Sequence, residues 1–254
     1  MSDQRDFFRD EERDYWAAAE GLKDEEVGLI EAWLDPAPAT LDAGTGGGRI
    51  ARALAARGYR SVTGFDFTPE LIAAARAADA HGAINFDVAD ATELPYTDAS
   101  FGQALYLQQV ISTIDDPEGR EAALHEAVRV LRPGGVALFS FVCLESRLSS
   151  LAQRGYVSYL RAVRRLRRDQ RPLQSMPRLR RRGRFGPAAL RDAGPFNWWY
   201  RAAEAENALR RAGFEPVGFA FGSDAAAGRL LPSAASALGA GAAGTLYVVV
   251  RKPG

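Results

Sequence analysis

One acid and a run of glycines form the first group of residues whose spacing could serve a ligand. In "LDAGTGGGRI" Asp42 is followed by Gly44, Gly46 and Gly48, an acid-x-Gly-x-Gly-x-Gly pattern. Glycine permits a tight backbone turn and lets a ligand approach without a Cβ in the way. Asp66 stands 24 residues after Asp42. A carboxylate at such a place can accept hydrogen bonds from both hydroxyls of a ribose.

Two ligand classes use a glycine turn of this kind. The dinucleotide fingerprint G-x-G-x-x-G, started at Gly44 and Gly46, requires glycine at the position that Arg49 occupies. The alternative pattern, an acid followed by G-x-G-x-G, is matched at every position. A glycine-rich turn is weak evidence when it stands alone. An ordinary tight loop therefore stays open at this step.

The elements that must position these residues alternate between strand and helix. The apolar run 39–43 predicts a buried strand, and the spacing of 48–59 predicts a helix, so the glycines occupy a strand-to-helix turn. The carboxyl ends of parallel strands are where a doubly wound sheet opens its ligand crevice. The pattern continues with strands at 60–67, 83–87 and 101–107, a helix that starts at Pro69 after the N-cap Thr68, and a second helix followed by a long apolar strand that ends near 143.

At this point the chain resembles the class I S-adenosylmethionine-dependent methyltransferases, specifically their small-molecule branch. The matching segments are "LDAGTGGGRIARALAARGY", "VTGFDFTPELIAAAR", "VADATELPYTDASF" and "AVRVLRPGGVALFSF", in the family's order. The resemblance implies an α/β, Rossmann-like doubly wound sheet of seven strands, the last one antiparallel. It divides the chain into N-terminal lid helices (1–38), a cofactor-binding core (39–143), a basic, Arg-rich helical cap (144–198) and the rest of the core (199–254).

The resemblance also implies S-adenosylmethionine as cofactor, with S-adenosylhomocysteine as product. The loop 44–48 would pack on the methionine part and Asp66 would hold the ribose. Asp90 would accept from the adenine amino group, although a loop-capping role for Asp90 stays open. The predicted cofactor-binding residues are Tyr15, Asp42, Gly44, Thr45, Gly46, Gly48, Asp66, Phe67, Asp90, Ala91, Leu107 and Gln108.

No catalytic base stands out in the sequence. A sulfonium methyl is already activated, so the protein must align the reactants, and a base matters only if the acceptor must lose a proton. The family often has a histidine after the fourth strand, where this chain has "VIST", and His81 and His125 are expected on the surface. The weak catalytic candidates are Tyr15, Gln108, Gln109, Trp198 and Tyr200. No metal is expected, and the single Cys143 excludes a cysteine-based zinc site.

A net charge of zero hides a separation of charges. Residues 147–191 carry 14 arginines and one acid, whereas the first 35 residues carry 12 acids and four bases. The stretch 148–170 predicts an amphipathic helix whose arginines lie toward one side. The other side would carry Leu148, Leu151, Tyr159, Val163 and Leu166. The insertion is either a solvated charged face or a contact for an anionic acceptor, an acidic carrier protein or a membrane surface. We hypothesise that part of 161–184 faces an anionic acceptor or carrier.

The sequence therefore predicts methyl transfer from S-adenosylmethionine to an O or N atom of a small metabolite, with an anionic or carrier-bound one as an option. The alternative is a non-catalytic module that binds the cofactor and docks an anionic partner through the arginines. A nucleic-acid partner is not expected, because no binding module is recognisable. No apolar run reaches the ~20 residues of a membrane span, and the charged N-terminus is not a signal peptide, so a cytoplasmic protein is expected. The run 225–244 predicts a flexible loop, and the oligomeric state stays open.

Overall fold

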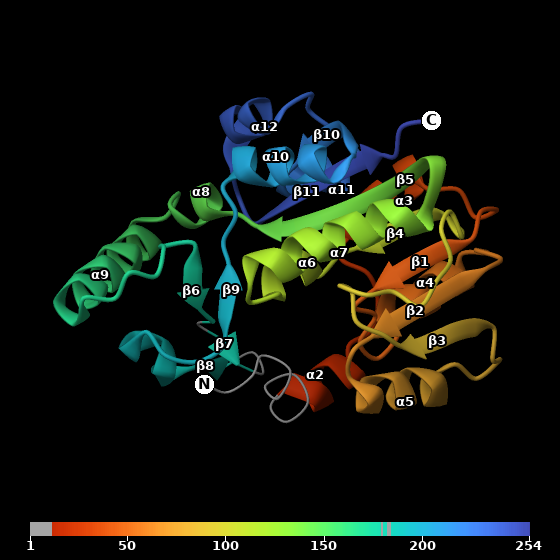
Figure 1. Cartoon of the computed structure of the whole chain (residues 1–254), viewed down its shortest axis with the longest axis horizontal. Helices are drawn as coiled ribbons and strands as arrows, with labels where there is room; N and C mark the ends of the chain where they lie inside the picture. The colour runs from red at the N-terminus through yellow and green to blue at the C-terminus, as the bar shows by residue number, and fades with distance from the viewer. Residues whose placement is uncertain (1–11, 179, 182–183) are drawn as a thin grey trace.

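The computed structural model of the chain describes residues 12–178, 180–181 and 184–254. Seven strands form one sheet in the order β10-β11-β5-β4-β1-β2-β3 (Figure 1). The first five strands of the chain run parallel, and β11 pairs antiparallel with both β5 and β10. The predicted Rossmann-like sheet with an antiparallel last strand is thus confirmed. Its strands are β1 (Thr40–Ala43), β2 (Val62–Asp66), β3 (Ile84–Val88), β4 (Phe101–Tyr106), β5 (Leu131–Val142), β10 (Glu215–Ala220) and β11 (Thr245–Arg251).

Helices cover both faces of the sheet, which explains why its central strands read as almost continuous apolar runs. Successive residues of β4 serve opposite faces. Tyr106 stacks on Phe139 at 4.9 Å in one core, while Leu105 and Leu138 belong to the other. The first core is completed by α7 (Pro117–Val130), α10 (Ala202–Ala212) and α12 (Ala234–Gly241), and the second by α3 (Asp24–Trp33), α4 (Arg49–Ala56), α5 (Pro69–Ala78) and α11 (Gly222–Ala226).

The strand order creates a crevice at the carboxyl ends of β1, β2 and β4. From β1 the chain continues outward through β2 and β3, and then returns to place β4 on the other side of β1. Such a reversal separates the loops that follow the neighbouring strands and opens a ligand crevice between them. The short helix α6 (Val110–Thr113) follows β4 at this edge.

The N-terminal helical segment 13–34 is two helices. After α2 (Arg13–Ala17) the chain turns at Gly21, whose φ is +68°, and α3 starts where the Glu26 side chain accepts from the Lys23 N–H at 2.9 Å. A Cβ on Gly28 would stand 2.2 Å from the Ala226 carbonyl oxygen, so α3 packs tightly on α11. Of the two helices, α2 lies over the crevice and α3 belongs to the layer that covers the sheet. Residues 1–11 of the predicted lid lie outside the described residues.

The Ala/Gly-rich run 225–244 was predicted as a loop, and that prediction is wrong. It contains the end of α11 and the whole of α12. Ser233 caps α12 by accepting from the Ser236 N–H at 3.1 Å, and Ala234 and Ala237 are buried. Alanine has the highest helix propensity, and small side chains let α12 pack closely on its neighbours.

The insertion forms a separate layer beside the sheet (Figure 1). Its elements are α8 (Leu144–Arg147), α9 (Leu151–Arg167), β6 (Ser175–Pro177), β7 (Arg180–Arg181), β8 (Arg184–Phe185), the 3₁₀ turn η2 (Pro187–Arg191) and β9 (Phe196–Trp198). The basic helix predicted here is present as α9. The sequence suggested an apolar side made of Leu148, Leu151, Tyr159, Val163 and Leu166. In the structure the buried positions of α9 are instead Val157, Leu160 and Arg164.

No helix among the described residues is long and apolar enough to cross a membrane.

Candidate functional site

The glycine loop between β1 and α4 forms the floor of the crevice. Gly44, Gly46 and Gly48 all have positive φ, at +62°, +55° and +81°, which side chains with a Cβ rarely adopt. Gly47 must be glycine for a different reason, since a Cβ there would stand 2.7 Å from the Ala17 carbonyl oxygen. The glycines therefore fold the loop tightly and let α2 rest directly on its backbone.

Asp42 holds this loop from below and does not reach the cavity. Its Oδ2 accepts from the Thr45 hydroxyl at 2.6 Å and from the Ala51 N–H at 3.1 Å, which ties β1 and the loop to the first turn of α4. Burial raises the pKa of Asp42 to about 7, and these two hydrogen bonds offset part of that rise. Of the predicted cofactor-binding residues, Asp42, Thr45, Gly48 and Leu107 are buried and do not line this cavity.

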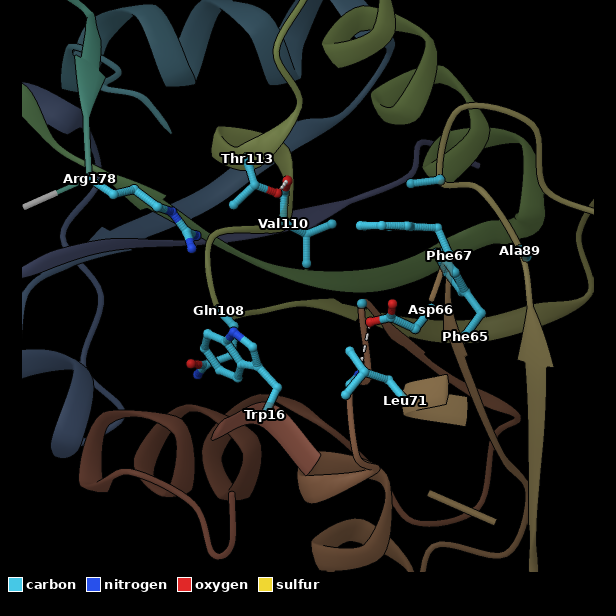
Figure 2. A pocket seen from close by; sticks show the side chains of 13 residues that line it. Trp16, Phe65, Asp66, Phe67, Leu71, Ala89, Gln108, Val110, Thr113 and Arg178 are labelled. Atoms are coloured by element: carbon cyan, nitrogen blue, oxygen red, sulfur yellow. Dashed lines mark hydrogen bonds between the residues drawn. The ribbon is translucent and has the colours of Figure 1, made fainter. Parts of the chain in front are cut away.

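Asp66 stands at the end of β2 and lines the cavity (Figure 2). One carboxylate oxygen accepts from the Gly46 N–H at 3.1 Å and the other from the Thr68 N–H at 2.9 Å. Burial raises the pKa of Asp66, while these backbone bonds favour its charged form. Each carboxylate oxygen has a second acceptor position. Asp66 is therefore oriented to accept from two neighbouring hydroxyls.

The cavity above the loop encloses about 600 Å³ of empty space, part of it open to solvent, within the usual range of small-molecule sites. In Figure 2 Phe67 and Val110 face each other, and Arg178 points in from the opposite side. The whole lining is Trp16, Gly44, Gly46, Phe65, Asp66, Phe67, Leu71, Ala89, Ala91, Gln108, Val110, Thr113 and Arg178. A glycine floor, a carboxylate for hydroxyls and an apolar slot fit the methionine, ribose and adenine parts of an adenosyl sulfonium.

The structure shows Asp90 in the loop-capping role, and its contact with the adenine amino group stays a prediction. Asp90 lines a second cavity, which shares Phe67 and Ala91 with the first. Its Oδ1 also accepts from the Thr92 N–H at 2.9 Å and the Thr92 hydroxyl at 2.8 Å, so it caps its own loop. The second cavity lies beside Phe67 and adjoins the first.

Gln108 and Gln109 follow β4 in an unusual backbone conformation. Their φ angles are +59° and +62°, a left-handed region that costs a non-glycine residue of order 1 kcal/mol or more. Gln108 lines the cavity, and its Nε2 donates to the Glu26 carboxylate. Gln109 donates instead to Ser140 and Thr245 on β5 and β11, and so it is directed away from the cavity.

The partner of Gln108 belongs to a buried ion pair that the sequence analysis missed. Both Glu26 carboxylate oxygens accept from the Arg49 guanidinium, at 2.7 and 2.9 Å. Glu26 is fully buried and Arg49 is 9% exposed. Arg49 served in the sequence only to exclude the dinucleotide pattern. No local signal links an acid in the first turn of α3 to the start of α4.

The N-terminal segment and the insertion meet beside the cavity through one carboxylate. Glu12 Oε2 accepts from Trp16 Nε1 at 2.9 Å and from Arg178 Nη1 at 2.7 Å, and Arg178 Nε donates to Asn197 at 2.9 Å. Arg178 is the one cap arginine among the described residues that lines this cavity. Tyr15, predicted at the site, is 51% exposed and borders an adjacent hollow beside Gln108.

Trp198 and Tyr200 do not belong to the crevice, so their candidacy as catalytic residues was wrong. They line a separate groove between α7 and α10. Trp198 Nε1 donates to Glu204 at 2.8 Å, and the Arg120 guanidinium lies 4.3 Å from the ring centre. Burial raises the pKa of Tyr200 to about 12.

The charged chemistry inside the cavity is limited to two groups. Among the described residues that line it, the ionisable side chains are Asp66 and Arg178. His81 and His125 are both exposed, as predicted. Within the described ranges no cluster of three or more His, Cys, Asp or Glu residues is arranged for a metal ion. The cavity is thus suited to binding and orienting a ligand, and the cation in its described lining, Arg178, is paired with Glu12.

Comparisons with known proteins point to one family. A family model described as "Methyltransferase domain" matches residues 41–139. An O-methyltransferase from Pyrenophora dematioidea is 37% identical over 107 residues, which cover 40% of this chain and 39% of that protein. A ubiquinone/menaquinone biosynthesis C-methyltransferase from Geotalea daltonii is 36% identical over 101 residues, covering 37% and 41% of the two chains. The chain spans about two fifths of the length of these curated relatives.

The fold is shared more widely than the sequence. A solved SAM-dependent methyltransferase from Methanosarcina mazei superposes with a TM-score of 0.65 at 22% identity, and the match covers 89% of this chain and 97% of that one. The matched segment 41–139 contains β2 to β4, most of β1 and β5, the glycine loop and Asp66. Residues 41–139 therefore match a methyltransferase domain, and the fold of the chain is similar to that of a solved SAM-dependent methyltransferase.

Proposed function

We propose that the protein binds S-adenosylmethionine in the glycine-loop cavity and transfers its methyl group to a small-molecule acceptor. The observation that carries this proposal is the position of Asp66, fixed by the Gly46 and Thr68 N–H groups beside a floor of glycine. The ribose hydroxyls would donate to Asp66, the adenine would lie between Phe67 and Val110, and the methionine part would rest on Gly44 and Gly46. When bound, the cofactor supplies an activated methyl group.

The protein's part in the reaction is to position the reactants and exclude water. Trp16 and Arg178 close the side of the cavity opposite Phe67, and α2 rests on the loop through Gly47. Holding an acceptor in line with a methyl group can contribute about 7–11 kcal/mol to the rate. No histidine lines the described part of the cavity. We therefore assign to this chain an acceptor oxygen or nitrogen that reacts without a histidine base.

Arg178 favours an acceptor that carries an acidic or anionic oxygen. A guanidinium holds a carboxylate or phenolate by charge-assisted hydrogen bonds and stabilises its deprotonated form. Among the arginines of 161–184 whose side chains the structure describes, Arg178 is the one that lines the cavity, and the hypothesis rests on it. Arg164 is wrong as a part of it, because Arg164 is 3% exposed and forms a two-bond ion pair with Asp192. Leu179, Arg182 and Gly183 of that range lie outside the described residues.

Calorimetry with S-adenosylmethionine, S-adenosylhomocysteine and NAD tests the cofactor. We expect the first two to bind and NAD not to bind. Asp66→Ala should weaken S-adenosylhomocysteine binding by about 1.5–3 kcal/mol, the cost of losing hydrogen bonds to a charged group. Binding of NAD without binding of S-adenosylmethionine would refute the proposal.

Methyl transfer is tested with methyl-labelled S-adenosylmethionine and a pool of metabolites. We expect label in a small acidic product, and Arg178→Gln should raise the KM of that acceptor while S-adenosylhomocysteine affinity stays within about twofold. Arg165→Gln, on the exposed side of α9, is the matched control. Cofactor binding without any label transfer would favour the second candidate, a non-catalytic module, which the absence of a histidine from the described lining keeps open.

A further inference from the structure

Helix α9 is already secured to the cap through one side. Val157 and Leu160 are buried in a small core with Leu144 and Met176. Arg164 completes this side with its ion pair to Asp192, at 2.7 and 2.8 Å. The fold therefore needs nothing further on the opposite side of the helix.

That opposite side carries large apolar side chains in water. Leu151 is 79% exposed and Leu166 is 85% exposed. The described residues include seven exposed large hydrophobic side chains, and four of them lie on α9 and η2: Leu151, Tyr159, Leu166 and Leu190. Single exposed apolar residues need no explanation, but their concentration on one helix marks an interaction surface.

The apolar positions form a continuous stripe. At 3.6 residues per turn, Leu151, Gly155, Ala162 and Leu166 fall along one line of the helix, with Tyr159 beside it. All five positions are exposed. Leu151 and Leu166 are about 22 Å apart at 1.5 Å per residue. Three of its residues, Leu151, Tyr159 and Leu166, belong to the apolar side that the sequence predicted.

A row of arginines borders the stripe. Arg154, Arg161 and Arg165 are exposed and fall on neighbouring turns of the same side. Among the described residues, no ion pair is formed by any of the three, and α9 itself contains no Asp or Glu. We define the outer face of α9 as the stripe together with this row. The positive charge of its arginines favours an anionic partner, and its exposed leucines favour a partner with an apolar region.

We propose that the outer face of α9 docks on the surface of an anionic lipid bilayer. A helix with an apolar stripe and basic residues at its border lies in the headgroup region, with the apolar side chains in the acyl boundary and the arginines at the phosphates. Figure 1 shows α9 at the periphery of the molecule, away from the sheet. The inference is independent of the proposed methyl transfer.

The other occupants fit the outer face less well. A second copy of the chain in a two-fold contact would bring Arg154, Arg161 and Arg165 close to their own counterparts, because the same patch meets itself. An acidic protein would pair with the arginines but gives no reason for two leucines about 80% exposed to solvent. An anionic bilayer satisfies both components of the face.

Vesicle flotation with the full chain tests the proposal. The probes are phosphatidylcholine vesicles and phosphatidylcholine vesicles that contain phosphatidylglycerol. We expect binding to the anionic vesicles. The triple variant Arg154→Gln/Arg161→Gln/Arg165→Gln should lose about 100-fold in partition, at about fivefold for each arginine. Leu151→Ser/Leu166→Ser should lose at least about tenfold, since each leucine inserts into the apolar boundary.

The control is Val88→Ser/Val217→Ser, which removes exposed apolar side chains from β3 and β10 and should leave flotation unchanged. Circular dichroism and S-adenosylhomocysteine affinity report separately on the fold and on the cofactor site. Four outcomes overturn the proposal: no binding of the wild type to anionic vesicles at low salt, an arginine effect without a leucine effect, equal losses in the control, or a leucine variant that loses self-association and keeps flotation. The second outcome would point to an acidic protein. If the leucine variant abolishes self-association in sedimentation instead of flotation, the occupant is a second copy.

Discussion

Arg49→Met is expected to lower the free energy of unfolding by about 3–5 kcal/mol, because it leaves a buried carboxylate without its cation. Glu26 is fully buried, and two hydrogen bonds of 2.7 and 2.9 Å join it to Arg49. The remaining donors to Glu26 are the Lys23 N–H and Gln108, which carry no charge. They can orient the carboxylate but cannot compensate its charge.

The double variant Glu26→Gln/Arg49→Met tests whether the loss of stability in Arg49→Met comes from the uncompensated charge of Glu26. Glutamine keeps an acceptor for the Lys23 N–H and removes the charge that Arg49 compensated. The double variant should therefore be more stable than Arg49→Met alone, by about 1–3 kcal/mol. Urea unfolding, followed by circular dichroism at pH 7, measures the free energy of unfolding of the wild type, of Arg49→Met and of the double variant. Additive losses in the double variant, or a loss below about 1 kcal/mol in Arg49→Met, would refute a net stabilising pair.

Asp98→Asn provides the surface comparison. Asp98 pairs with Arg129 at 2.9 Å, but its side chain is 80% exposed. Solvent screens such a pair, so the expected loss is below about 1 kcal/mol. The buried pair also holds Gln108 at the cavity, so Arg49→Met should weaken S-adenosylhomocysteine binding as well, whereas Asp98→Asn should not.

Three further predictions concern the loop, the lid and the groove. Between pH 3.8 and about 7 the folded chain holds a proton on Asp42 that the unfolded chain has released. The free energy of unfolding should therefore fall as the pH rises through that window, by up to about 4 kcal/mol, and Asp42→Asn should flatten the slope in urea titrations. Gly47→Ala should displace α2, because its Cβ would contact the Ala17 backbone at 2.7 Å, and should change tryptophan fluorescence in a way that Trp16→Phe abolishes. Tyr200→Phe should leave S-adenosylhomocysteine affinity within about twofold, and a larger loss would place Tyr200 back at the site.

The core of the fold was predictable because its signals are local. Alternating apolar runs and a glycine turn define β1, α4 and β2 within the segment 39–66, and the carboxyl end of β2 fixes the place of Asp66. The contacts that depend on distant segments were not predictable. Glu26 meets Arg49 across 23 residues, and Arg178 meets Glu12 across 166. Nothing near any of these four residues in the sequence indicates its partner.

Helix α9 shows why a hydrophobic pattern alone does not identify the buried side of a helix. The pattern contains two candidate sides, one with Leu151 and Leu166 and one with Val157 and Leu160. The side with Leu151 and Leu166 looks more apolar in the sequence. The side with Val157 and Leu160 also carries Arg164, and an arginine is costly to bury without a partner. Arg164 is nevertheless buried, since Asp192 compensates its charge and the carbonyl oxygens of Pro172 and Ser175 accept its remaining hydrogen bonds. Once that partner is present, the cap can bury the arginine side, and the leucines of α9 are left for a surface outside the protein.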